Sequence, residues 1–130
     1  MKKLLIVICI AFSTVAFSQT KNDLVFKEMT HSFGKVKQNI PVTYVFSFTN
    51  NSSKPAVIEF VNPDCGCTTP EYSKDPILKG KSSNIKVTYN AATPGSFKKN
   101  VNIKFASIEL PIVVTIDGEV VTAATKKSGK

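Results

Sequence analysis

Two cysteines separated by one glycine are the residues of this sequence best suited to chemistry. Cys65, Gly66 and Cys67 lie in the stretch NPDCGCTTPE, residues 62–71, whereas Cys9 lies in an apolar N-terminal stretch. Outside the cytoplasm, neighbouring thiols tend to oxidise, and a disulfide ring with one intervening residue is strained and easily reduced. Two thiolates also suit copper(I) or zinc, although a structural zinc site usually has four ligands. A third interpretation is structural, with the cysteines acting as small buried apolar residues or as a turn clamp. The residues leave all three interpretations open.

The other side chains capable of catalysis are scattered along the chain. His31 is the only histidine, and one isolated histidine more often packs or forms a hydrogen bond than binds a ligand. No serine or threonine lies in a nucleophile-elbow pattern, and no glycine-rich loop is available to hold a phosphate. Asp64, Glu71 and Asp75 lie near the cysteines, which is typical of a polar loop. We therefore predict that the chain is not an enzyme, and we expect no cofactor and no complete metal site.

The N-terminal residues follow the pattern of a secretory signal peptide. Two lysines precede an apolar stretch over residues 4–12, and the small residues Ala16 and Ser18 occupy positions −3 and −1 of a cleavage site before Gln19. The apolar stretch is shorter than the ~20 residues that a spanning helix needs. Residues 1–18 are therefore predicted to be a signal peptide, and the chain is predicted to be exported to the periplasm, the cell envelope or the extracellular space.

The rest of the chain is predicted to be one domain over residues 19–120, followed by a basic flexible tail over residues 121–130. No later apolar stretch is long enough to cross a membrane, so we expect no stable membrane span after signal cleavage. The formal net charge is +8, but every basic residue is a lysine. Because arginine is the residue that grips phosphate and guanine edges with two hydrogen bonds, we expect no nucleic acid as a partner. The expected partner is another envelope or extracellular protein.

Apolar residues recur with period two through most of the domain, which predicts strands with one buried face and one wet face. The alternation covers residues 42–49, 85–90, 101–105 and 108–117, and shorter strands are expected over 55–61 and 24–29. Short strands with loop clusters between them predict an all-β fold, an antiparallel β-sandwich of about seven strands. The predicted core residues are Phe26, Phe33, Tyr44, Phe46, Phe48, Ile58, Phe60, Ile85, Val87, Tyr89, Phe97, Val101, Ile103, Phe105, Leu110, Ile112, Val114 and Ile116.

The order of motifs resembles the DUF1573 family of secreted or periplasmic single-domain proteins. HSFGKV (31–36), CGCTTPE (65–71), PILKGK (76–81) and IDGEV (116–120) carry the resemblance. It implies an immunoglobulin-like sandwich related in shape to PapD-type domains, and it covers nearly the whole mature chain. The motif and structural positions shared with the family are His31, Phe33, Gly34, Cys65, Gly66, Cys67, Thr68, Pro70, Pro76, Gly80, Gly95 and Gly118.

Three places depart from the family's usual pattern. The family usually has glycine where Asn39 stands, but asparagine tolerates the left-handed conformation, so a turn is expected to survive there. It commonly has serine or threonine where Asp64 stands. The turn near Ala106 and Ser107 is shorter and lacks the usual polar residues.

Two hypotheses of function follow. The first is a non-catalytic binding or structural module, because sandwiches present loops and sheet edges to partners. The alternative is a thiol-redox or soft-metal-handling protein that acts through Cys65 and Cys67. Both cysteines are expected where the strand over 55–61 ends, because Pro63 and Gly66 break its pattern. A disulfide between them requires a tight bend at Gly66.

Overall fold

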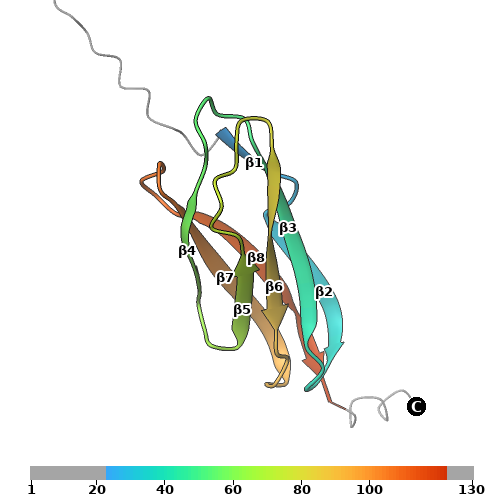
Figure 1. Ribbon diagram of the computed structural model, residues 1–130. Helices are drawn as coiled ribbons and strands as arrows, with labels where there is room; N and C mark the ends of the chain where they lie inside the picture. Colours follow the sequence, from blue (N-terminus) through green and yellow to red (C-terminus); the bar gives the residue numbers. More distant parts are fainter. Residues whose placement is uncertain (1–22, 123–130) are drawn as a thin grey trace, which may run out of the picture.

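The computed structural model describes residues 23–122, and its eight regular elements are all strands (Figure 1). They are β1 (Leu24–Phe26), β2 (Thr30–Lys37), β3 (Val42–Asn50), β4 (Ile58–Pro63), β5 (Thr68–Tyr72), β6 (Ser82–Tyr89), β7 (Gly95–Phe105) and β8 (Ile112–Val121). Strand β8 continues one residue past the predicted end of the domain. The predicted signal peptide and residues 123–130 of the predicted tail lie outside the described residues. In the described part of the chain, no helix has the length and apolar character needed to cross a membrane.

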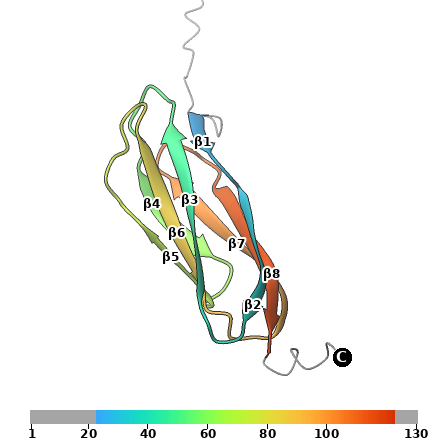
Figure 2. The same cartoon turned by 90° about the vertical axis from the view of Figure 1, so that its right-hand side faces the viewer.

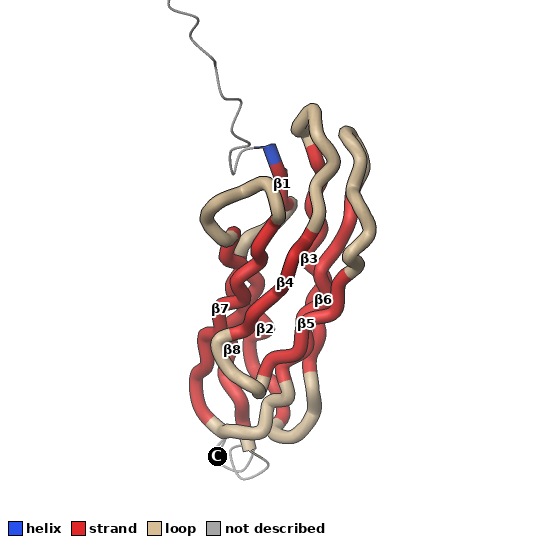
Figure 3. Tube along the Cα trace, turned by 60° about the vertical axis from the view of Figure 1, so that its left-hand side comes forward, coloured by secondary structure: helices blue, strands red, loops and turns tan. Residues whose placement is uncertain are grey.

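The strands form two four-stranded sheets that pack face to face (Figure 2). One sheet has the order β1-β3-β6-β5 and the other β2-β8-β7-β4. All pairings are antiparallel except β2 with β8, which is parallel. The loops gather at the two ends of the sandwich (Figure 3). The predicted all-β sandwich is confirmed, with eight strands instead of about seven.

The first predicted strand, over residues 24–29, matches β1 alone, and β2, which follows in the other sheet, was not predicted. β1 pairs with β3, then residues 27–29 cross to the other sheet, where β2 pairs with β8. β2 has the sequence THSFGKVK, in which one glycine and two lysines hide the alternation. The chain turns back after β2 through Asn39, which has a φ of 64°. The expectation that asparagine would sustain a left-handed turn at this position is therefore confirmed.

The core fills the space between the sheets, and most of the predicted inward residues lie in it. Phe46, Phe48, Ile85, Val101 and Phe105 are buried, and such side chains stabilise a fold by roughly 1.5–3 kcal/mol each relative to exposure. Three predicted core aromatics are half-buried and pack against the core from its side: Phe26, Phe33 and Tyr44. The buried apolar residues that are absent from the predicted core are Leu24, Val36, Ala56, Ile77, Ala91, Ile108 and Val120.

Two predicted core residues are instead exposed. Phe60 is 49% exposed because the register of β4 against β7 shifts between Ile58 and Phe60, so the side chain turns to the outer face. Leu110 is 62% exposed because the last strand begins only at Ile112. The alternation that starts at Ile108 therefore runs through a loop before the strand begins.

A buried polar network organises the loop that follows β3. Asn50 is fully buried, and its Nδ2 donates to the carbonyl oxygens of Lys54 and Ile77, both at 2.8 Å. Its Oδ1 accepts from the backbone N–H of Ser52 at 3.0 Å and from the Ser52 hydroxyl at 2.7 Å. The carbonyl of Asn50 also accepts from the N–H of Gly80 at 2.6 Å. One amide side chain thus joins two loops at this end of the sandwich.

Candidate functional site

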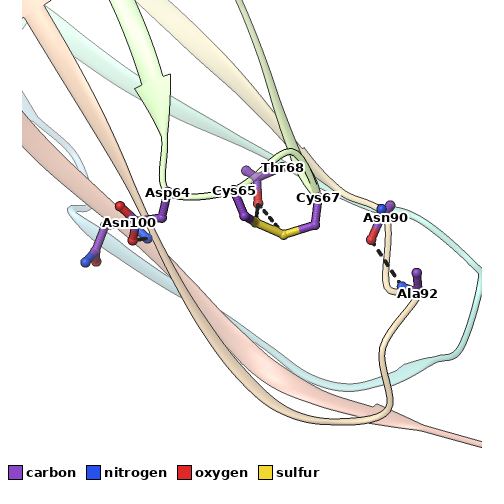
Figure 4. Close-up of a disulfide and its surroundings, with 7 residues drawn as sticks. All are labelled: Asp64, Cys65, Cys67, Thr68, Asn90, Ala92 and Asn100. Carbon is purple, nitrogen blue, oxygen red and sulfur yellow. Dashed lines mark hydrogen bonds between the residues drawn. A yellow bond between two sulfur atoms is a disulfide. The ribbon is translucent and has the colours of Figure 1, made fainter.

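The two cysteines lie in the turn between β4 and β5 and form a disulfide (Figure 4). Their Cα atoms are 5.2 Å apart, shorter than the 6–7 Å expected of an extended three-residue segment at ~3.3 Å rise per residue. The N–H of Thr68 donates to the carbonyl of Cys65 at 3.3 Å, which closes the bend around Gly66. The predicted position at the end of β4 is confirmed, and the bend that a disulfide requires is present.

Backbone hydrogen bonds attach this turn to both sheets. The N–H of Asp64 donates to the carbonyl of Asn100 on β7 at 3.0 Å, and the N–H of Asn100 donates back to Asp64 Oδ2 at 2.9 Å. The N–H of Asn90 donates to the carbonyl of Cys67 at 2.9 Å. Asp64, which departs from the family pattern, therefore has a clear role as a hydrogen-bond acceptor that anchors the turn.

The hydroxyl of Thr68 faces both sulfur atoms. Its Oγ1 lies 3.7 Å from Cys65 Sγ and 3.8 Å from Cys67 Sγ. Disulfide sulfurs carry no hydrogen, so the single hydrogen of the hydroxyl can be donated to either sulfur. The residue is only 2% exposed, whereas both cysteines are half-buried and Cys67 packs against the core. The disulfide thus has one face on the protein and one face toward solvent.

Soft-metal binding receives no support from the arrangement of ligands. Across residues 23–122, no group of three or more histidine, cysteine, aspartate or glutamate side chains lies together in a way that could hold a metal ion. The two cysteines are joined to each other and offer no thiolate in this state. Of the three interpretations, the structure therefore favours a disulfide over a soft-metal site.

His31 lies in an aromatic cluster that joins the two sheets. Its ring stacks on Tyr44, with centroids 3.6 Å apart and planes inclined by 7°, and meets Phe33 edge-on at 4.8 Å. Its Nδ1 is 3.9 Å from Glu28 Oε2, the atom that also accepts a short hydrogen bond from the Tyr44 hydroxyl. That hydrogen bond, together with partial desolvation and the negative charge of Glu28, raises the pKa of Tyr44. The histidine is packed and paired, as expected of a structural residue.

The structure divides the predicted motif residues among separate places. His31, Phe33 and Gly34 belong to β2, at one edge of their sheet. The group from Cys65 to Pro70 belongs to the β4–β5 turn and to β5, an edge strand of the other sheet. Two further motif residues, Pro76 and Gly80, lie in the loop before β6, where Gly80 joins the Asn50 network. The motif residues therefore do not converge on one site.

An apolar hollow that the sequence analysis did not predict lies between β1 and the start of β8. It has a volume of about 270 Å³ and is lined by Leu24, Phe26, Met29, Ile112 and Val113. We call it the β1–β8 hollow. Met29 and Val113 are partly exposed at its rim. No local pattern indicated this region, because β1 and β8 are far apart in the sequence.

Comparisons with known proteins support the fold and the family. The chain is similar over 75% of its length to 46% of a protein of unknown function from Porphyromonas gingivalis W83, with 12% identity and a TM-score of 0.65. It is similar over 87% of its length to 97% of the seventh PapD-like domain of human CEP192, with 7% identity and a TM-score of 0.64. It is also similar over 75% of its length to 52% of the YadV chaperone, with 15% identity and a TM-score of 0.52.

The chain thus spans less than half of the Porphyromonas protein, and at these identities the likenesses establish a PapD-like sandwich fold alone. No curated protein matches the chain. The model of one family, described as a protein of unknown function (DUF1573), matches residues 24–120, which include the disulfide turn and all but the last residue of β8. The chain belongs to the DUF1573 family.

Proposed function

We propose that the protein is exported and serves, in the periplasm or cell envelope, as a non-catalytic binding module for another envelope or extracellular protein. The observation that carries this proposal is the β1–β8 hollow. Val113 is 40% exposed at its rim, and the more exposed Leu110 lies three residues earlier in the chain. Apolar side chains grouped around a hollow are typical of a surface that receives apolar side chains of a partner.

Binding of a partner through side chains is favoured over pairing of a partner strand with a sheet edge, because edge strands β5, β2 and β4 are poorly suited to such pairing. The N–H of Asn90 bonds the carbonyl of Cys67, and hydrogen-bonded pairs alternate along an antiparallel ladder. The backbone groups of Pro70 therefore face the free edge of β5, where proline has no N–H to donate. Edge strands β2 and β4 both contain register shifts, which interrupt a regular ladder. A partner is thus expected to bind through the hollow.

Export rests on the signal-peptide pattern of residues 1–18 and is tested separately. Intact-mass analysis of the protein recovered from the envelope fraction should give a chain that begins at Gln19. A recovered mass that still includes Cys9 would contradict signal cleavage. The disulfide adds support, because disulfides persist in oxidising compartments outside the cytoplasm.

Site-specific crosslinking in the native cell tests the binding surface. A photoreactive amino acid placed at Val113 should give one main adduct with a second protein. The same residue placed at Val45, which is 42% exposed on the outer face of the other sheet, is the matched control and should give none. Met29→Ser with Leu110→Ser should lower the adduct yield roughly tenfold, because hot-spot truncations cost about 2 kcal/mol or more.

Two outcomes would contradict this proposal. The first is equal crosslinking at Val45 and Val113, or a yield at Val113 that the substitutions at Met29 and Leu110 leave unchanged. The second is an adduct whose mass equals two copies of this chain, which would assign the hollow to self-association instead. Circular dichroism of each variant separates loss of binding from loss of folding.

A further inference from the structure

The Cys65–Cys67 disulfide contributes little to holding the fold together. It joins residues two positions apart on the same turn, and the entropy that a disulfide removes from the unfolded chain falls as the closed loop becomes shorter. The turn has independent attachments, through Asp64 to β7 and through Cys67 to Asn90. A buried disulfide that joins distant strands would have a clear structural purpose, and this one needs a different explanation.

The two sulfur atoms differ in what surrounds them, and the difference suits thiol–disulfide exchange. Cys67 packs against the core, whereas Cys65, equally half-buried, is not part of that packing. Exchange requires an incoming thiolate to approach one sulfur along the line of the S–S bond while the other departs as a thiolate. Because Cys67 packs against the core and Cys65 does not, we infer that the incoming thiolate attacks Cys65 and that Cys67 departs as the thiolate.

Thr68 is placed to stabilise the thiolate that departs. Its hydroxyl is a donor within 3.8 Å of both sulfurs, and a hydrogen bond to a charged group is worth more than one to a neutral group. Because Thr68 is buried and its backbone N–H closes the turn, the hydroxyl does not have to be ordered during the reaction. The donor is therefore in place before the charge develops.

We propose that this disulfide is a thiol–disulfide exchange site that oxidises a dithiol of another exported protein, an activity beyond the proposed binding function. One partner thiolate attacks Cys65 Sγ, the Cys65–Cys67 bond breaks, and Cys67 leaves as a thiolate that takes up a proton. The second partner thiolate then attacks the partner sulfur of the mixed disulfide, and Cys65 leaves as a thiolate that is protonated in turn. Two electrons pass from the partner to this chain. The partner gains a disulfide, this chain becomes a dithiol, and no other reactant is consumed.

The test uses the full chain carrying Cys9→Ser, purified in its disulfide form, so that Cys65 and Cys67 are the only cysteines. The probe is a synthetic peptide with two reduced cysteines separated by two residues. Mass spectrometry after acid quenching should show one peptide disulfide formed per protein molecule reduced. A monothiol version of the peptide, in excess, should be found attached to Cys65 and not to Cys67.

Substitutions at Thr68 separate a role in exchange from a role in folding. Thr68→Val should slow exchange roughly tenfold through loss of one hydrogen bond to a thiolate, and Thr68→Ser should restore most of the rate. Thr69→Val, at the next and exposed position, is the matched control and should exchange at the parent rate. Thermal melting of each variant shows whether it is folded, so that exchange rates are compared between folded proteins only.

The proposal is overturned if the protein leaves the peptide reduced over a period in which oxidised glutathione converts the peptide to its disulfide. It is also overturned if the protein cannot be purified in its disulfide form. Equal rates for Thr68→Val and the parent would remove Thr68 from the mechanism. These outcomes are independent of crosslinking at Val113, so failure here leaves the binding proposal standing, and the reverse also holds.

Discussion

The ring of His31 lies flat on the ring of Tyr44, and this contact joins β2 of one sheet to β3 of the other. At this edge the chain has just crossed between the sheets through residues 27–29. Glu28, on that crossing, accepts the Tyr44 hydroxyl and approaches His31 Nδ1. The three residues therefore hold in place the segment through which the chain passes from β1 in one sheet to β2 in the other.

The first prediction concerns the ionisation of Tyr44. Its folded pKa is raised above the model-compound value of 10.0, first by the hydrogen bond to Glu28. A raised pKa means that the folded state holds the proton more tightly than the unfolded state. The resulting stabilisation is fully present below about pH 10 and is lost as the pH rises through the folded pKa.

Absorbance titration of tyrosinate measures this effect. Glu28→Gln should lower the pKa of Tyr44 toward 10.0, because the negative charge beside the hydroxyl is removed. Glu71→Gln is the matched control, since Glu71 is an exposed carboxylate that pairs with Lys86, and it should leave the titration of Tyr44 unchanged. If both variants titrate like the parent, the contact with Glu28 does not exist in solution.

The second prediction concerns the inward face of β3. Phe46 is 1% exposed, so Phe46→Asp places an unpaired charge in the core. We expect a loss of about 4 kcal/mol or more in the free energy of unfolding, enough to unfold a domain of ordinary stability. Val45→Asp, one residue earlier on the outer face, should cost about 0.5 kcal/mol or less. Circular dichroism and thermal melting compare the two, and equal melting temperatures would mean that the assignment of faces is wrong.

Alternation of apolar residues was enough to predict the sandwich and most of its core, because one buried face and one wet face leave a period of two in the sequence. It failed at Phe60, where a register shift in β4 reverses the faces, and at Leu110, where the pattern continues through a loop. A bulge depends on the partner strand and leaves no local signal. The same limit applies to β5, whose sequence TTPEY contains proline and reads as loop until its pairing with β6 is seen.

The candidate site was predictable only in part. The spacing of Cys65 and Cys67 and the breaks around them indicated a turn, and the compartment indicated oxidation. The role of Thr68 depends on the direction of one hydroxyl, and the β1–β8 hollow brings Met29 beside Val113 across two sheets. The hollow joins residues far apart in the chain, so it could not be read from the sequence. The Thr68 contacts are local, but they depend on the bend around Gly66, which the residue pattern left open.

The third prediction concerns Gly118, which allows β8 to pass close to β2 and β7. A Cβ atom at this position would lie 2.8 Å from the carbonyl oxygen of Gly34 and 2.9 Å from the ring of Phe97. Because the nearest atom is backbone, Gly118→Ala should cost about 1–3 kcal/mol of unfolding free energy. The measurement is urea denaturation.

Gly66→Ala is the matched control for Gly118→Ala. A Cβ atom at Gly66 meets nothing within 4 Å, and Gly66 is not among the residues with positive φ. We expect its denaturation midpoint in urea to stay close to that of the parent. A large loss of stability for Gly66→Ala together with none for Gly118→Ala would contradict the packing described at both positions.

The last prediction separates the stability of the fold from the state of the disulfide. Cys65→Ser with Cys67→Ser should lower the free energy of unfolding by about 2 kcal/mol or less, because closing a loop with one intervening residue removes little entropy from the unfolded chain. The Asp64–Asn100 and Asn90–Cys67 backbone bonds remain available to the variant. Asp64→Ala keeps the disulfide and removes the carboxylate that accepts the N–H of Asn100, and it should cost about 1–3 kcal/mol. Thermal melting of the parent and the two variants decides which attachment holds the turn. If the serine pair loses several kcal/mol while Asp64→Ala loses none, the disulfide is a structural staple and its use in exchange loses its rationale.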